Sequence, residues 1–451
     1  MASYRVKSTR EPRLNSVPAL YPNFTDYLWR HQRFYARYRE RWPGTLCDPY
    51  DLLDPQQVKY HDFAKLVSAA HNVLSLYRRI NQFLKSAPYQ LYEELGIPAE
   101  VIYLSQCDSP VSDFLLTRLD FVRSDEGWKF LECNFDNPGL MVETFAINEV
   151  VCSEIGRCDP NRAASRALPN RLHRAIASAA RHLGKRVDEC RVGVCSPSNY
   201  KRDTDAARYV VDTLRSVRQV NAYHVWLEEL RADEVGVYDW EDRKIDVLFR
   251  GYPLREFCRL GIPYKNRPNI TLDYRQLHTL CTQRKLAIVN TAFAAVLESK
   301  AVQALIWLLC DEEMYFGPED RQLVRRYMPR TFFDRPRHLE KFVVKPMYGC
   351  EGSGIRVIDS TGNVMERTIA KHDSRELCVY QQYIEIPSIA TMTEFGIQEL
   401  RFVMSVFMVN DSELGICYRA GEGITDASWW VAPVYLADCK NDLRRPIRKT
   451  L

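Results

Sequence analysis

The chain has 451 residues, 46% of them hydrophobic and 27% charged, a composition that is ordinary for a globular protein. Its net charge of +4 is too small for this length to indicate a nucleic-acid partner. No apolar run reaches membrane-spanning length and the first residues lack an apolar signal core, so we expect a cytoplasmic protein with no membrane partner. The 14 cysteines are scattered without a C-x-x-C pair, which favours reduced thiols over a disulfide scaffold. The length predicts two or three domains.

The predicted elements divide the chain into four parts in sequence order. These are a mainly helical N-terminal region at 1–112, a hairpin followed by a helix at 113–165, an α/β subdomain at 166–290, and a final region with a C-terminal tail at 291–451. Apolar residues at helical spacing predict a helix over 63–84 and one long helix over 291–309. Short apolar runs at 191–195 and 245–249, separated by a helical pattern, predict a doubly wound sheet in the third part.

The hairpin in the second part has one apolar and one polar face. Its predicted strands, at 117–122 and 130–134, are joined by residues that tolerate a tight turn. Because side chains alternate along each strand, Asp120 lies opposite or nearly opposite Glu132, and two such carboxylates repel. A divalent cation between them relieves the repulsion, and Asn134 adds an oxygen ligand of the kind that Mg²⁺ prefers. The hairpin therefore predicts a metal site, with a solvated polar sheet face as the alternative.

Three arginines follow the strand at 245–249 in the third part, namely Arg250, Arg255 and Arg259. Guanidinium groups bind carboxylates in a two-pronged geometry. The group is therefore a candidate for binding a substrate carboxylate, and ordinary surface charge is the alternative.

The fourth part contains a lysine followed by a glycine-rich loop. Lys345 ends an apolar strand, and three glycines then fall within residues 349–354. Glycines let backbone amides approach a ligand, and a lysine at the preceding strand end can reach phosphate oxygens. The lysine precedes the glycines, so this is not a Walker motif. The pattern predicts a flexible phosphate cover that includes Gly349, Gly352, Ser353 and Gly354, with a plain hairpin turn as the alternative.

Residues 379–385 alternate apolar and polar side chains before Pro387. A strand that leads into a hinge between domains would expose backbone groups suited to the edge of an adenine ring. An ordinary sheet strand is the alternative, and the order of lysine, glycine loop and hinge favours the nucleotide interpretation.

Five motifs in this order resemble the ATP-grasp superfamily, and most closely its glutathionylspermidine synthase-like group. The motifs are Arg118-Leu119-Asp120 with Leu131-Glu132-Cys133-Asn134, the segment 245–253, Lys300, Val344-Lys345-Pro346 with its glycine loop, and the segment 415–419. Most ATP-grasp chains present the lysines first and the Glu-x-Asn motif last. Here the metal motif comes first, which is the circularly permuted order of this group. Five motifs in order are far more specific than any one of them.

The resemblance covers about residues 113–425 and implies an α/β (α+β) chain with an ATP-grasp fold. The hairpin part would belong to the ATP-grasp core, the third part would be a preATP-grasp-like substrate subdomain, and the fourth would bind the nucleotide. ATP and two Mg²⁺ ions are the implied cofactors. Site residues carried over by motif are the metal ligands Asp120, Glu132 and Asn134, the nucleotide lysines Lys300 and Lys345, the adenine hinge Gln382, Tyr383 and Ile384, and the catalytic arginines Arg118 and Arg419.

The implied activity is ADP-forming ligation of a carboxylate to an amine through an acyl phosphate. The partners are then small-molecule acids and amines. The ligase would act on an amino acid, a small peptide or a specialised metabolite. The N-terminal part shows no papain-like cysteine amidase pattern, which bifunctional relatives carry, so glutathione and spermidine are not inferred. A kinase acting on a hydroxyl and a non-catalytic nucleotide-binding protein are the alternatives, and the sequence does not indicate the oligomeric state.

Overall fold

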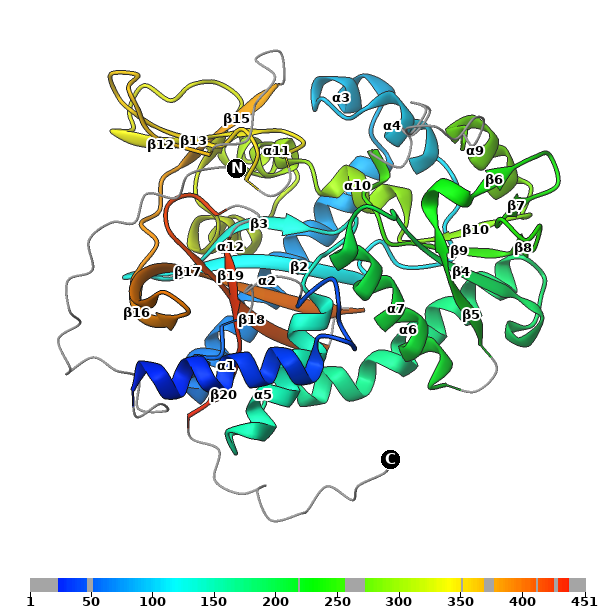
Figure 1. Cartoon of the computed structure of the whole chain (residues 1–451). Coiled ribbons are helices and arrows are strands. Elements are labelled where there is room, and N and C mark those ends of the chain that lie inside the picture. Colours follow the sequence, from blue (N-terminus) through cyan, green and yellow to red (C-terminus); the bar gives the residue numbers. More distant parts are fainter. Residues whose placement is uncertain are drawn as a thin grey trace.

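The structure is a computed structural model and places three main sheets side by side. The described residues are 23–46, 52–217, 220–255, 272–349, 352–368, 377–410, 413–425 and 429–437. A six-stranded antiparallel sheet lies in the middle, a five-stranded antiparallel sheet at the upper left and a four-stranded parallel sheet on the right (Figure 1). Across the described part of the chain, every helix is too short or too polar to cross a membrane.

The described part of the N-terminal region is mainly helical, and its longest helix packs on one face of the central sheet. Its helices are α1 (Phe24–Tyr38), α2 (Tyr60–Lys85), α3 (Tyr89–Glu94) and α4 (Ala99–Ser105). The helix predicted over 63–84 is α2, whose apolar stripe is fully buried. Its Tyr77 ring packs edge-on against Phe130 and Phe135 of the central sheet region, at centroid distances of 5.8 and 4.9 Å. Burial of this stripe fixes the helical region to the sheet.

The central sheet joins strands from the two ends of the chain. Its order is β19-β18-β17-β2-β3, with β16 on β17, and the strands are β2 (Leu116–Ser124), β3 (Gly127–Asn134), β16 (Ser388–Thr393), β17 (Gly396–Val409), β18 (Glu413–Gly421) and β19 (Trp430–Ala432). The predicted hairpin is β2 and β3. Strand β2 pairs with β17 along its length, from Leu116 opposite Val409 to Phe121 opposite Met404. This pairing places the predicted metal motif of β2 in the same sheet as the late segment of the chain.

The second sheet has the order β11-β15-β12-β13-β14. Its strands are β11 (Thr331–Phe332), β12 (Lys341–Pro346), β13 (Arg356–Asp359), β14 (Val364–Arg367) and β15 (Cys378–Gln382), and the adjacent helices are α10 (Ala292–Leu297), α11 (Lys300–Asp311) and α12 (Pro318–Tyr327). The single helix predicted over 291–309 is wrong, because α10 ends before Glu298 and α11 begins at Lys300. Ser299 caps α11 by accepting a hydrogen bond from the backbone of Ala301 at 3.3 Å. Helical periodicity continues through such a break, so the pattern alone does not reveal it.

The third sheet is parallel, with the order β10-β9-β4-β5, as a doubly wound arrangement predicts. It contains β4 (Arg191–Ser196), β5 (Asn221–Trp226), β9 (Val247–Arg250) and β10 (Ala287–Val289), with α6 (Arg162–His182), α7 (Lys201–Arg215) and α9 (Tyr274–Thr282) beside it. The remaining elements are β1 (Gln56–Val58), β20 (Val434–Leu436), β6 (Arg231–Ala232), β7 (Val237–Tyr238), β8 (Lys244–Ile245), the π-helix η2 (Glu143–Ile147), α5 (Asn148–Glu154), η3 (Val187–Glu189) and η4 (Leu227–Glu229).

Most of the described cysteines are free thiols, as predicted. They are Cys107, Cys133, Cys152, Cys190, Cys195, Cys281, Cys310, Cys378 and Cys417. Cys158 is the exception, because it forms a disulfide bond. The expectation of reduced thiols is therefore wrong at that position, where the sequence pattern gave no signal.

Candidate functional site

The two carboxylates of the hairpin face one another across β2 and β3. Asp120 pairs directly with Glu132, as predicted, but the register shifts after this pair, so that Phe121 lies opposite Phe130. Leu131 is therefore the extra residue of a β-bulge, which the alternation pattern did not reveal. Bulges re-aim backbone groups and side chains next to functional sites.

Asp120 is held by three donors within the central sheet. Arg118 forms a two-pronged ion pair with it, with Nε 3.0 Å from Oδ1 and Nη2 3.1 Å from Oδ2. The Ser405 hydroxyl donates to Oδ1 at 2.8 Å, and the Asn134 amide donates to Oδ2 at 3.3 Å. Burial lowers the pKa of Arg118, but the Asp120 charge outweighs it and the pKa lies above the usual value. The guanidinium therefore stays charged beside this carboxylate.

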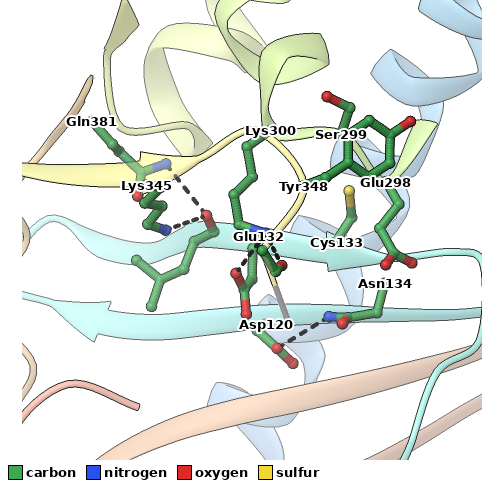
Figure 2. A network of polar contacts seen from close by, with 12 residues as sticks. Asp120, Glu132, Cys133, Asn134, Glu298, Ser299, Lys300, Lys345, Tyr348 and Gln381 are labelled. Carbon is green, nitrogen blue, oxygen red and sulfur yellow. Dashed lines mark hydrogen bonds and ion pairs between the residues drawn. The ribbon is translucent and has the colours of Figure 1, made fainter. Parts of the chain in front are cut away.

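Glu132 faces the lysine that begins α11 (Figure 2). The Lys300 Nζ lies 3.7 Å from Glu132 Oε2 and donates to the backbone oxygen of Gly349 at 2.8 Å. Burial raises the pKa of Glu132, but Lys300, Lys345 and two arginines lower it to about 2. A quarter of the Glu132 side chain remains exposed, so a charged carboxylate faces open space.

The bulge presents the Leu131 carbonyl to the second sheet. Lys345 Nζ and Gln381 Nε2 both donate to this oxygen at 3.3 Å, and both side chains reach it from neighbouring strands β12 and β15 (Figure 2). Burial lowers the pKa of Lys345 to about 8, and the nearby Lys300 adds to this effect while Glu132 opposes it. The carbonyl thus links β3, which carries two of the predicted metal ligands, to Lys345, the predicted nucleotide lysine.

Arg419 lies on the same face of the central sheet as Asp120. It follows Cys417 by two residues on β18, and Cys417 pairs with Ser405, which in turn pairs with Asp120. Alternate residues of a strand share a face. Arg419 is also buried and pairs with Val403, whose side chain lines the cavity described next. The structure thus brings both predicted arginines to one face.

A cavity lies between the central sheet and the second sheet. Predicted site residues on its wall are Asp120, Glu132, Lys345, Gln382, Tyr383 and Ile384. Gly352, Ser353 and Gly354 are not among the lining residues, although Ile355 directly after them is. Gly352 and Gly354 have φ values of 72° and 73°, a backbone conformation that glycine adopts without strain. Gly349 joins the site through its bond to Lys300.

Sequence reasoning missed two charged residues on this wall. Glu366 of β14 and Arg401 of β17 form an ion pair across the two sheets, with Arg401 Nη1 at 3.0 and 3.1 Å from the two carboxylate oxygens. It also missed Lys341, whose Nζ lies 3.5 Å from the ring centroid of Tyr383. All three residues lie on strands whose apolar and polar side chains alternate in the ordinary way. Their place in the site therefore follows only from the packing of the two sheets.

The repulsion that predicted a metal is already relieved by protein cations. Arg118 pairs with Asp120, and Lys300 faces Glu132, so the hairpin is electrostatically stable as the chain folds it. Among the described residues, no group of three or more His, Cys, Asp and Glu side chains is placed to hold a metal ion. Asp120, Glu132 and the Asn134 amide are a small oxygen donor set, which fits Mg²⁺ that carries phosphate oxygens as further ligands. The argument from repulsion is therefore wrong, while the donor set fits the predicted ion.

Arg250, at the end of β9, and Arg255 are the described members of the predicted arginine group, and they have different environments. Arg250 is fully buried and bonds to Asp136 and to the backbone oxygens of Tyr252 and Asn290. Arg255 donates to the backbone oxygen of Tyr348, beside the glycine loop. Arg259 lies outside the described residues. Arg250 is thus a structural residue, and the periodicity of a short strand end could not show its burial.

The hairpin with its two carboxylates lies in one sheet and faces Lys345 and β15 of a second sheet, and a parallel α/β subdomain lies beside them. This arrangement defines an ATP-grasp fold with circularly permuted motif order. Residues 55–436 match the family described as glutathionylspermidine synthase preATP-grasp, and the chain belongs to this family.

Two solved structures are similar to the chain at low sequence identity. One is a glutathione synthetase-like effector from Globodera pallida in its apo form, 13% identical, with a TM-score of 0.57 over 94% of this chain and 100% of that one. The other is from Methylobacillus flagellatus and is assigned provisionally as a gamma-glutamylcysteine synthetase; it is 12% identical, with a TM-score of 0.39 over 84% of this chain and 87% of that one. The first similarity supports the fold.

Proposed function

We propose that this protein is an ATP-dependent, ADP-forming ligase that joins a carboxylate to an amine through an acyl phosphate. The observation that carries the proposal is the cluster of Glu132, Lys300 and Lys345 at a cavity between two sheets. Phosphoryl transfer needs positioning and neutralisation of charge more than covalent chemistry from the protein. This cluster supplies charge of both signs at one point.

Different residues of the cavity would contact the adenine and the phosphates of ATP. Backbone groups of Gln382, Tyr383 and Ile384 follow β15 and would meet the adenine edge, while apolar side chains such as Val343 and Val357 would pack on its ring. Lys345 and Lys300 would hold the phosphates, and the loop at 349–354 would cover them. Among the described residues, the Lys345 ammonium is bonded to one backbone oxygen at 3.3 Å, so it can turn toward a phosphate at small cost.

Mg²⁺ fits this site when it is bound together with the nucleotide. Asp120 and Glu132 would hold it with the Asn134 amide oxygen, and the resemblance implies two ions. Bound Mg²⁺ would neutralise negative charge on the phosphate oxygens. Lys300 and Lys345 oppose a bare cation at Glu132, so the protein alone should bind Mg²⁺ weakly.

Arg118 lies next to Asp120 on the side away from the hinge and would receive the transferred phosphoryl group. Its Nη1 donates to the backbone oxygen of Gly139 at 3.3 Å, which aims the guanidinium along the loop after β3. Arg419 on the same face would stabilise the anionic intermediate. A carboxylate substrate would attack the terminal phosphate of ATP, and an amine would then displace inorganic phosphate from the acyl phosphate.

The test is coupled ADP release on a panel of substrates. Acids would be L-amino acids, dipeptides and glutathione, and amines would be L-amino acids, alkyl diamines and spermidine, with MgATP. ADP release that needs both an acid and an amine supports a ligase, whereas release with a hydroxyl compound alone indicates a kinase. Absence of turnover together with measurable ATP binding would indicate a non-catalytic protein.

A pair of variants tests whether the hairpin carries the reaction. Glu132→Gln removes a predicted metal ligand and should lower ADP release at least hundredfold, which is about 3 kcal/mol. Glu126→Gln makes the same change on the turn of the same hairpin, where the carboxylate is exposed and bonds only to Lys129 among the described residues. It should retain full activity. Retained turnover in Glu132→Gln would remove the metal assignment.

A further inference from the structure

Glu143 is a buried carboxylate that has no role in the proposed function so far. It lies on the side of Arg118 away from the cavity, where the acceptor amine would bind. Alternate residues of β17 lead along this face away from the cavity. Val403 lines the cavity, Ser405 bonds to Asp120, and Phe407 pairs with Arg118. The next element along this face is the π-helix η2, whose Phe145 ring packs on Phe407 at 5.6 Å. Glu143 is the first residue of η2. It therefore lies beyond Arg118 as seen from the cavity between the two sheets.

The backbone at Glu143 is held closely against β18. The Thr144 hydroxyl donates to the Cys417 sulfur at 3.3 Å, and Gly415 lies so near η2 that an added Cβ would be 2.5 Å from the Phe145 ring. π-Helical turns of this kind occur frequently at functional sites. These close contacts fix the backbone at Glu143 and therefore the position of its Cα atom.

The Glu143 carboxylate is buried without a neutralising hydrogen bond. The residue is 6% exposed, and among the described residues its carboxylate accepts a hydrogen bond only from its own backbone N–H. The charged groups around it are Arg118 of β2 and Arg202 and Asp205 of α7, together with the Cys417 thiol of β18. Burial raises the pKa of Glu143 to about 7, which Asp205 supports and the two arginines oppose.

The other carboxylates near the site are already occupied. Asp120 is held by Arg118, Ser405 and Asn134. Glu132 faces Lys300 at 3.7 Å and is assigned to the metal in the proposed function. Glu298 also has a pKa near 7, raised by burial and by Asp136, but it accepts the backbone N–H groups of Phe135 and Asp136 at 3.1 and 2.9 Å. Among the described residues near the site, Glu143 is a buried carboxylate whose one hydrogen bond comes from its own backbone N–H.

We infer that Glu143 is the general base that takes a proton from the acceptor amine, an inference that rests on the proposed ligase function. An alkyl amine is an ammonium ion at neutral pH and cannot attack a carbonyl carbon until it loses a proton. The ammonium gives one proton to the Glu143 carboxylate. The amine nitrogen then bonds to the acyl carbon, the bond from that carbon to the phosphate oxygen breaks, and the phosphate leaves with the second proton as hydrogen phosphate.

Hydroxylamine separates this step from the formation of the acyl phosphate. It is uncharged at neutral pH, so it traps an acyl phosphate as a hydroxamate without a base. The enzyme would be assayed with MgATP and the acid panel, using hydroxylamine or 1,4-diaminobutane and L-amino acids as the nucleophile. Glu143→Gln should keep hydroxamate formation within about twofold and lower amide formation about a hundredfold or more at pH 7.

The pH profile gives a second readout that a purely structural role would not move. The carboxylate form of Glu143 is lost as pH falls through about 7, so amide formation by the wild type should fall there. Glu143→Gln should lack this fall near pH 7. Its rate of amide formation should recover as pH rises toward the pKa of the amine. Glu154→Gln, in the helix that follows η2 and with an exposed carboxylate, is the matched control and should behave as wild type.

Each result bears directly on the inference. Equal loss of hydroxamate and amide in Glu143→Gln, or full amide formation at pH 7, would overturn it. If Glu143→Gln does not fold, Glu143→Asp carries the test: the shorter side chain should lower amide formation at least tenfold with hydroxamate unchanged, and equal losses would overturn the inference. A wild type that forms no hydroxamate with any acid would overturn the ligase proposal itself, which is a different result.

Discussion

Two buried pairs of arginine and aspartate in this molecule have the same chemistry and different surroundings. Arg118 and Asp120 lie two residues apart on β2, and Asp120 lines a cavity. Arg250 and Asp136 connect β9 of the parallel sheet to the loop after β3, and Arg250 has no exposed surface at all. The comparison shows that a buried arginine alone does not mark a site. A site also needs an open face beside the charge.

The two aspartates also differ in how many donors remain if the arginine is removed. Asp120 keeps the Ser405 hydroxyl and the Asn134 amide. Asp136 keeps the backbone N–H of Leu254, so its second oxygen loses its charged partner in a closed environment. We therefore expect removal of Arg250 to affect folding and removal of Arg118 to affect the reaction.

Arg250→Met gives the largest expected effect on stability. It leaves the Asp136 charge buried without a cation, which costs about 3–5 kcal/mol. Chemical denaturation should show this as a lower free energy of unfolding, with the activity per folded molecule retained. A fully stable Arg250→Met protein without activity would instead place Arg250 in the substrate site.

Arg118→Met should lower the rate of ADP release at least hundredfold, about 3 kcal/mol of transition-state stabilisation. Its loss of stability should be smaller than that of Arg250→Met because Asp120 keeps two donors. Arg123→Met, on the same strand with an exposed side chain paired to Asp62, is the matched control. Unaltered kinetics in Arg118→Met would separate Arg118 from the phosphoryl group.

Asp54 extends the comparison to a buried aspartate without a cation. Among the described residues its carboxylate accepts only the Met392 backbone N–H, and burial raises its pKa to about 6. A raised pKa contributes stability below the unfolded value near 3.8, and this contribution is lost as pH rises through about 6.

Asp54→Asn removes that titration. The free energy of unfolding of the wild type, measured relative to Asp54→Asn by urea denaturation, should fall from pH 4 to pH 7 by about 2 kcal/mol. A difference that does not change with pH would show that Asp54 titrates normally.

Lys345→Met tests the cation that reaches the site from the second sheet. The Leu131 carbonyl keeps its bond from Gln381, so the fold should be retained. The loss of a phosphate-binding charge should raise the KM for ATP about tenfold or more, equivalent to about 1.4 kcal/mol. The control is Lys285→Met, because the Lys285 Nζ donates to the backbone oxygen of Glu234 in another part of the chain. An unchanged KM in Lys345→Met would exclude Lys345 from the nucleotide site.

Alternation and motif order determined a large part of the site in advance. Period-two alternation placed Asp120 opposite Glu132, because side chains of a strand point to opposite faces in turn. The order of the five motifs predicted the permuted ATP-grasp fold, and the alternating apolar runs predicted the parallel sheet. Alternation depends on local geometry, which the sequence encodes within a few residues, whereas the motif order is informative through its resemblance to a known family.

Contacts between distant segments were decided only by the tertiary structure. The bulge at Leu131 and the ion pair between Glu366 and Arg401 each involve a partner far away in the chain. The neutralisation of the hairpin carboxylates by Arg118 and Lys300 belongs to the same class, because it requires α11 to begin where the hairpin ends. Periodicity reports which face a residue takes, whereas burial and charge balance depend on what the rest of the chain brings to that face.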